Sequence, residues 1–257
     1  MKASTYKKLF AAVFSLASIA GAAQAQSGAE TVYQITPYAW ATGVGGDITV
    51  PGAPTISIDK SFSDLIKDLD VAFFVSAYAR HGNIVFMGDL STSSSSRSGV
   101  TPSPPAPGPL PATGKLRQTS ITALVGYRVA SSPEATFDIL AGARHWRVRG
   151  EVDVPPVPGL FPGASATRSR SFTDPLIAAR ANFQIAPGWS ALLYADVGGF
   201  GVGSRSTAQL LGTVNYQVRE NAFLSVGYRH LHVDYRDGGT RFDMRMSGPI
   251  VGATLRF

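Results

Sequence analysis

Apolar and polar residues alternate along much of the chain in segments of about ten residues, which is the period of a β-strand with two different faces. In residues 172–186, Ile177 and the alternate residues around it are apolar, whereas Arg180 lies on the opposite, more polar face. Residues 207–218 repeat this pattern, with Val214 on the apolar face. The chain is therefore predicted to be all-β.

Ten such segments are separated by connections of unequal length. They lie at about residues 32–43, 71–80, 84–93, 116–129, 136–150, 172–186, 190–202, 207–218, 223–236 and 243–257. The connections after the second, fourth, sixth and eighth segments are short, whereas those after the first, third and fifth have about twenty residues or more. A soluble β-sandwich would show the same alternation, but the unequal connections favour a closed antiparallel transmembrane β-barrel. We expect ten strands, with eight as the alternative, and both termini on the periplasmic side.

The two ends of the chain support export and membrane insertion. Residues 1–25 have the three parts of a secretory signal peptide: early lysines, an apolar stretch over 9–20, and the small-x-small site Ala23-Gln24-Ala25. Residues 26–257 then form one barrel domain. The last strand ends at Phe257, an aromatic residue that would suit a membrane interface.

Composition excludes several classes. The chain has no cysteine, so no disulfide framework holds the exported protein together. The formal net charge of +6 falls to +3 without the signal segment, which contributes three lysines and no acid. The remaining arginines are spread along the strands, so no nucleic-acid partner is expected. Rossmann, P-loop and zinc motifs are absent, and no cofactor is expected.

The long connections have distinctive sequences. Proline-rich tips lie at 50–54, 101–114 and 154–163, and the serine-rich tract 91–98 reads as a solvated rim. Apolar residues recur at helical spacing within 61–70, which predicts a short amphipathic helix with Ser61 and Asp64 as its capping pair.

Several short wall-like motifs resemble those of the small opacity-type and OmpW-like outer-membrane β-barrels. They are Thr36–Trp40, Gly142–Trp146, Asp174–Leu176, Asp196–Gly201 and Val226–Arg229, followed by the terminal Phe257. The resemblance implies a bacterial outer-membrane location with outer-membrane lipid as a partner. It also implies recognition of the last strand by the outer-membrane assembly machinery, with Phe257 and Leu255 as the signal.

Five charged residues are predicted to point into the lumen: Asp89, Arg144, Arg180, Asp196 and Arg229. Arg180 and Asp196 lie on either side of the Pro187-Gly188 turn, so we expect them to be cross-strand neighbours. Such charges could form a structural ion-pair network that fills the barrel or line a solute-selective constriction.

His230, His232 and Asp234 alternate on one face of the ninth strand, a spacing that could bind a metal or support acid–base hydrolysis. No nucleophile motif accompanies them, so we expect no metal site and no enzyme. The leading hypothesis is a surface-exposed structural or interaction protein or a narrow pore. The alternatives are a transporter of small or apolar solutes, which makes a small solute a possible partner, and a hydrolase at the rim.

Overall fold

The computed structural model describes residues 31–49, 56–100, 110–159 and 161–257. The predicted signal peptide and the proline-rich segments 50–54 and 101–109 therefore lie outside the described residues. In the described residues the strands are β1 (Thr31–Trp40), β2 (Gly43–Thr49), β3 (Ile56–Lys60), β4 (Leu69–His81), β5 (Ile84–Val100), β6 (Pro111–Ser131), β7 (Ala135–Val154), β8 (Ala164–Ala186), β9 (Trp189–Gly198), β10 (Ser206–Arg219), β11 (Ala222–Asp237) and β12 (Thr240–Arg256), and the helix is α2 (Phe62–Asp68).

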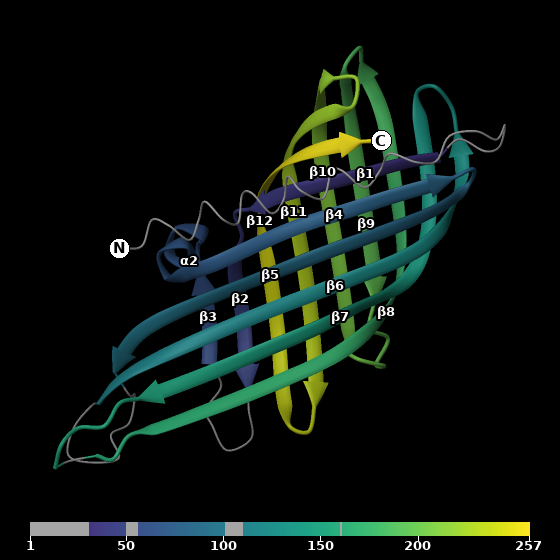
Figure 1. Cartoon of the computed structure of the whole chain (residues 1–257). Coiled ribbons are helices and arrows are strands. Elements are labelled where there is room, and N and C mark those ends of the chain that lie inside the picture. The colour runs from purple at the N-terminus through teal and green to yellow at the C-terminus, as the bar shows by residue number, and fades with distance from the viewer. Residues whose placement is uncertain (1–30, 50–55, 101–109, 160) are drawn as a thin grey trace.

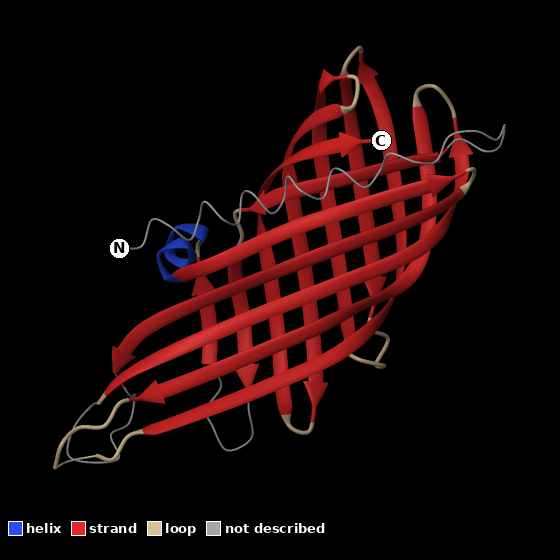
Figure 2. Cartoon of the chain, viewed as in Figure 1, coloured by secondary structure: helices blue, strands red, loops and turns tan. Residues whose placement is uncertain are grey.

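Antiparallel pairing closes the sheet into a ten-stranded barrel (Figures 1 and 2). β1 pairs with β4 on one side and with β12 on the other, and β4 to β12 follow in sequence order. We call the end with the short turns at 82–83, 132–134, 187–188 and 220–221 the turn end, and the opposite end the loop end. The prediction of a closed ten-stranded barrel is confirmed.

The first predicted strand, 32–43, is wrong in its bounds because the strand is interrupted after Trp40 and a new one starts at Gly43. β2 continues the path of β1 along β12, and β3 pairs with β2, so a short hairpin extends the wall at the loop end. From the sequence, residues 44–49 are expected to lie in a loop, because glycines interrupt the alternation there. At Gly46 a side chain would collide with the carbonyl of Asp243, so glycine permits the close pairing of β2 with β12.

Strands β5 to β8 are longer than predicted and extend together at the loop end (Figure 1). The serine-rich tract 91–98, expected as a solvated rim, belongs to β5 and pairs with β6. Pro111 starts β6, a position where its missing N–H removes no interior ladder bond. In contrast, β9 ends at Gly198 rather than at 202, because positive φ angles at Gly199, Phe200 and Gly201 turn the chain.

The helix α2 lies between β3 and β4. The Asp64 N–H donates to Ser61 Oγ at 3.3 Å, and Ser61 Oγ donates to Asp64 Oδ2 at 2.7 Å, which confirms the predicted capping pair. The helix ends at Asp68, and Leu69 already starts β4. In the described part of the chain, no helix has the length and apolarity needed to cross a membrane.

The wall has an apolar outer face, as the alternation predicts. Inward residues such as Val85, Leu124, Leu140 and Leu176 are buried. Exposed apolar side chains surround the barrel on its outside and form what we call the apolar belt: Ile84, Phe86, Ile121, Val125, Tyr127, Ile139, Ile177, Leu193, Val197, Leu210, Val214, Tyr216, Leu224, Val226, Tyr228, Val251 and Leu255. Apolar surface of this extent requires an apolar environment.

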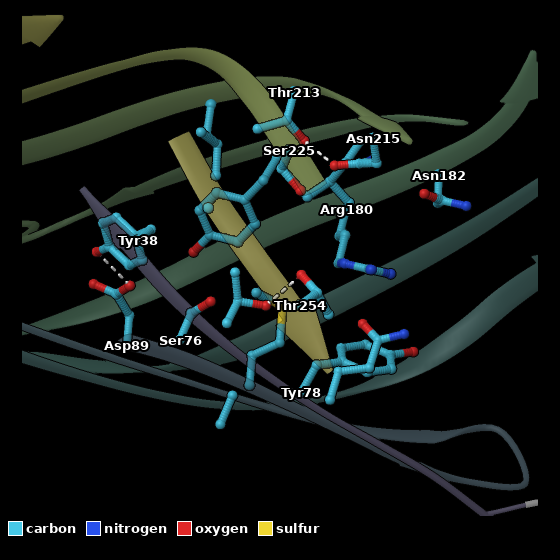
Figure 3. Close-up of a pocket in the computed structure, with 18 of the residues that line it drawn as sticks. Tyr38, Ser76, Tyr78, Asp89, Arg180, Asn182, Thr213, Asn215, Ser225 and Thr254 are labelled. Carbon is cyan, nitrogen blue, oxygen red and sulfur yellow. Dashed lines mark hydrogen bonds between the residues drawn. The ribbon is translucent and has the colours of Figure 1, made fainter. Parts of the chain in front are cut away.

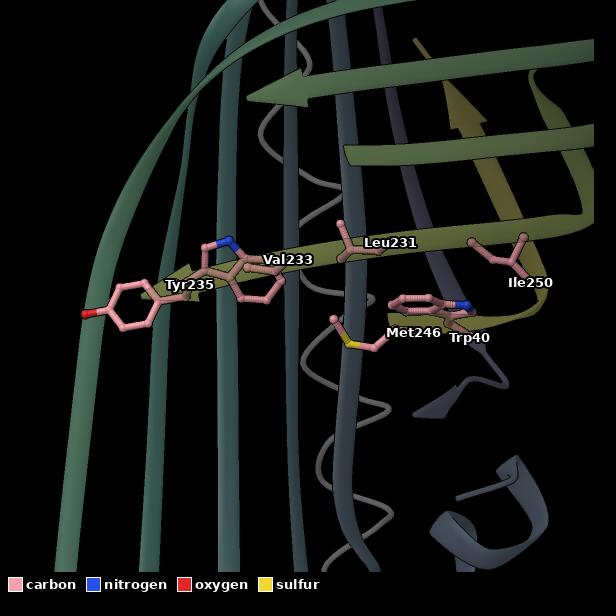
Figure 4. Close-up of a cluster of buried hydrophobic side chains, with 7 residues drawn as sticks. Trp40, Leu231, Val233, Tyr235, Met246 and Ile250 are labelled. Carbon is pink, nitrogen blue, oxygen red and sulfur yellow. The ribbon is translucent and has the colours of Figure 1, made fainter. Parts of the chain in front are cut away.

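The interior of the loop end is filled by a hydrophobic cluster (Figure 4). Its buried members, which we call the aromatic plug, are Trp40, Trp146, Leu231, Val233, Tyr235, Met246 and Ile250. Phe172 stacks on Tyr235 with ring centroids 4.3 Å apart and on Trp146 at 6.3 Å. Side chains from strands on opposite sides of the barrel therefore meet across the lumen.

Candidate functional site in the lumen

A buried ion pair lies near the middle of the lumen. Arg144 on β7 and Asp196 on β9 form two hydrogen bonds, Nη2 to Oδ2 at 2.6 Å and Nη1 to Oδ1 at 3.2 Å. Their side chains are only 1% and 0% exposed. Thr122 accepts a hydrogen bond from Arg144, and the Tyr194 hydroxyl donates to Asp196. This bidentate pair is fully satisfied by its neighbours.

A second ion pair joins the opposite side of the barrel to the first. Arg229 on β11 donates to Asp89 at 3.4 Å and to the Tyr38 hydroxyl at 2.6 Å, and that hydroxyl donates to Asp89 at 2.8 Å (Figure 3). Gln209 Oε1 accepts hydrogen bonds from Arg229 at 2.7 Å and from Arg144 at 3.4 Å. The two ion pairs form one network, which we call the charge layer.

Arg180 belongs to a different cluster, so its expected pairing with Asp196 is wrong. It lies opposite Tyr194 on β9, and its guanidinium donates to Asp138 on β7 at 3.1 Å. Asp196 lies opposite Ala178, two residues from Arg180 along β8. Arg180 is seven residues before Pro187, whereas Asp196 is eight residues after Gly188, and a register shift between Gln184 and Ala186 adds a second residue of offset.

Sequence reasoning missed the partners in this second cluster. Asp138 accepts hydrogen bonds from Arg128 at 2.8 Å as well as from Arg180. Asp138 lies six residues before Arg144 on β7, an even spacing that puts both side chains on the same face. The alternation could therefore have identified Asp138 as a residue of the lumen. Arg128 gave a weaker signal because a register shift follows it in β6.

A polar cavity of about 410 Å³ lies on the turn-end side of the charge layer. Its wall runs from Asp89 and Arg229 to Gln184, Gln217 and Arg256 near the short turns. Figure 3 shows Ser76, Asn182, Thr213, Asn215, Ser225 and Thr254 among the side chains around it. Beyond the charge layer the aromatic plug fills the lumen, so the cavity ends inside the barrel.

The three residues considered for metal binding or hydrolysis do not converge. His230 Nδ1 lies 2.6 Å from Ser247 Oγ, and His232 Nε2 lies 3.0 Å from Asp243 Oδ1. Asp234 binds Arg236 at 3.1 Å. The hydrogen bond from His232 lowers the pKa of Asp243 below its ordinary value. Among the described residues, no group of three or more His, Asp or Glu side chains could hold a metal ion.

The last strand closes the barrel. The Phe257 N–H donates to the Tyr33 carbonyl at 2.9 Å, and the Tyr33 N–H donates to the Phe257 carbonyl at 3.1 Å. Leu255, opposite Ile35, is exposed on the outer face. The role of Phe257 and Leu255 as an assembly signal stays a prediction.

No protein-family model matches the chain, and no curated protein sequence matches it. Solved structures do. The outer-membrane protease OmpT from Escherichia coli aligns with a TM-score of 0.54 at 10% identity, covering 91% of this chain and 99% of that chain. The translocator domain of the autotransporter NalP from Neisseria meningitidis gives 0.48 at 12% identity and covers all of both chains. The attachment invasion locus protein Ail of Yersinia pestis gives 0.36 at 12% identity, with 89% and 99% covered. The likeness to OmpT shows that the chain has the fold of an outer-membrane β-barrel.

Proposed function

We propose that the protein is a bacterial outer-membrane β-barrel with a closed lumen, which acts as a surface-exposed structural or interaction protein. The apolar belt supports membrane insertion because it surrounds the wall between the turn end and the loop end. The strands that extend beyond it at the loop end, β5 to β8, would then project from the outer surface. The interaction surface would be these extensions.

The proposal of a closed lumen rests on two barriers that follow one another along the barrel axis. The charge layer spans the barrel from Asp89 to Asp196 through Arg229, Gln209 and Arg144. The aromatic plug then fills the interior on the loop-end side. An ion that crossed would have to break buried ion pairs and then pass the apolar side chains of the plug, and both steps are costly.

The cavity at the turn end could hold a small solute, because polar and apolar side chains both line it. The aromatic plug lies beyond the charge layer, so this cavity gives no path across the barrel. A hydrolase at His232 lacks support because the histidine and its partner Asp243 lie on the wall, on the face opposite the buried Leu231 and Val233. We therefore do not extend the proposal to transport or catalysis.

Cell fractionation of the full chain tests the proposal. We expect the protein in the outer-membrane fraction, with a mobility in detergent gels that changes on boiling because a closed barrel resists unfolding without heat. Protein that stays soluble in the periplasm, or membrane protein whose mobility is insensitive to boiling, would contradict the proposal.

A further inference from the structure

Three exposed arginines lie together on the outward face of β6 and β7, and no described carboxylate lies within ion-pair distance of them. They are Arg117, Arg147 and Arg149, which we call the arginine patch. The ion pair beside them, Lys115 Nζ to Glu151 Oε1 at 3.9 Å, involves none of the three. The patch therefore carries three positive charges without compensation from the fold.

The register of the sheet makes this arrangement unfavourable in the absence of a ligand. Arg117 lies directly opposite Arg149 on the neighbouring strand. Like charges in opposed positions destabilise a sheet. An anion bound between two guanidinium groups would replace this repulsion with charge-assisted hydrogen bonds, for which arginine has the best geometry.

The patch lies at the height where a membrane changes from hydrocarbon to headgroups. Arg117 and Arg147 continue the same outward faces as the belt residues Ile121 and Ile139. Two residues of a strand tilted by about 45° correspond to about 5 Å of height. Along β6, Arg117 is four residues beyond Ile121, and along β7, Arg147 is four residues beyond Ala143, the last apolar residue on the outward face before His145 and Arg147. These two arginines thus lie about 10 Å above the apolar part of the wall, in the headgroup region of a bilayer.

Hydroxyl side chains surround the arginines. Arg147 lies between Thr119 and Ser171, and Arg149 has Ser169 on its other side. Hydroxyl groups donate hydrogen bonds to phosphate oxygens, so these residues complement the guanidinium groups. The patch combines fixed positive charge, hydroxyl donors and an apolar wall beneath them, and this combination matches a phosphorylated headgroup whose acyl chains lie along the belt.

We propose that the arginine patch binds the phosphate groups of lipid headgroups in the membrane leaflet at the loop end. The inference rests on the proposed membrane-barrel function. It adds a partner of defined chemistry and a place for it on the wall. Binding would fix the depth of the barrel and hold β6 and β7 together where their charges otherwise repel.

The test uses the folded full chain in zwitterionic detergent, so its result does not depend on where the protein resides in the cell. Native mass spectrometry would measure binding of phosphatidic acid, of phosphatidylcholine and of inorganic phosphate alone. The test variant is Arg117→Gln/Arg149→Gln. The matched control is Arg168→Gln/Arg170→Gln, which removes two exposed charges from the neighbouring strand β8, opposite Gly150 and Val148 and on the inner face of the sheet. Heat-modifiable mobility in gels confirms that each variant is folded.

We expect wild type to prefer phosphatidic acid over phosphatidylcholine, and the Arg117/Arg149 variant to bind phosphatidic acid about tenfold more weakly. The control variant should keep the wild-type affinity, and inorganic phosphate alone should not bind saturably. Without lipid, the Arg117/Arg149 variant should melt no lower than wild type, because a repulsion has been removed. Unchanged affinity in that variant, or an equal loss in the control, would overturn the proposal. Loss of heat-modifiable mobility in wild type would instead count against the barrel function itself.

Discussion

The guanidinium of Arg144 is buried in the lumen, unlike those of the exposed arginines on the outer wall. The stability of the barrel therefore depends on its counter-ion, Asp196. The side chains of Arg144 and Asp196 are almost completely excluded from solvent and lie 2.6 Å apart at their closest atoms. Desolvation of two charges costs several kcal/mol, which the pair offsets only while both members are present. A change at one member therefore leaves an uncompensated buried charge.

We predict that Asp196→Asn lowers the free energy of unfolding by about 3 kcal/mol, because Arg144 stays buried without its counter-ion. Urea unfolding of the detergent-solubilised barrel measures the change. Asp153→Asn, at an exposed position near the end of β7, is the control and should change stability by less than about 0.5 kcal/mol. Adding Arg144→Met to Asp196→Asn should recover part of the loss. Equal stability of the Asp196 and Asp153 variants would contradict the account.

The His232–Asp243 pair should make stability depend on pH. The pKa of Asp243 is lowered in the folded protein, chiefly by the hydrogen bond from His232. A lowered folded pKa means that the stabilisation is present above the unfolded value of about 4 and is lost as the pH falls through the folded pKa. We predict that His232→Ala raises the pKa of Asp243 in an NMR titration. The variant should be less stable than wild type above about pH 4, and this difference in unfolding free energy should shrink as the pH falls through the folded pKa of Asp243. An unchanged Asp243 titration would show that the hydrogen bond does not set the pKa.

At the level of the strands, one glycine determines whether β10 and β11 can pair closely. A side chain at Gly227 would collide with the Gly212 carbonyl and the Thr213 backbone, whereas one at Gly212 would meet only the end of Leu193 at 3.4 Å. We predict that Gly227→Ala prevents correct folding or lowers the melting temperature sharply, and that the matched change Gly212→Ala is tolerated. Heat-modifiable mobility and thermal unfolding compare the two. Similar behaviour of both variants would contradict this assignment.

The elements differ in how far the sequence could predict them. The faces of residues 172–186 follow from a local two-residue period, so they were predicted correctly. The tract 91–98 is polar on both faces and has no such period, and it forms a strand because β6 pairs with all of it and β4 pairs with residues 91–95. Parity was sufficient to place Arg144 and Arg229 in the lumen. It could not find the partner of Arg180, because Asp138 lies directly opposite it on β7, and the register of β7 against β8 does not follow from the two-residue period.

For the whole molecule, the interior changes character along the barrel axis. A polar cavity occupies the turn end, the charge layer crosses the middle, and the aromatic plug fills the loop end. The outer face changes in parallel, from the apolar belt to the arginine patch. Such an arrangement suits a barrel that is anchored in the membrane and sealed, with its contacts made by the extended strands and not through the lumen.

Electrical conductance of the purified wild-type protein in planar lipid bilayers tests the sealed lumen most directly. An open porin recorded under the same conditions shows that insertion would be detected, and recovery of the inserted protein with heat-modifiable mobility shows that the barrel is intact. We predict no steady single-channel current above the bilayer background, because the charge layer and the aromatic plug both close the lumen. Reproducible, long-lived open-channel currents from the intact wild-type barrel would contradict the account.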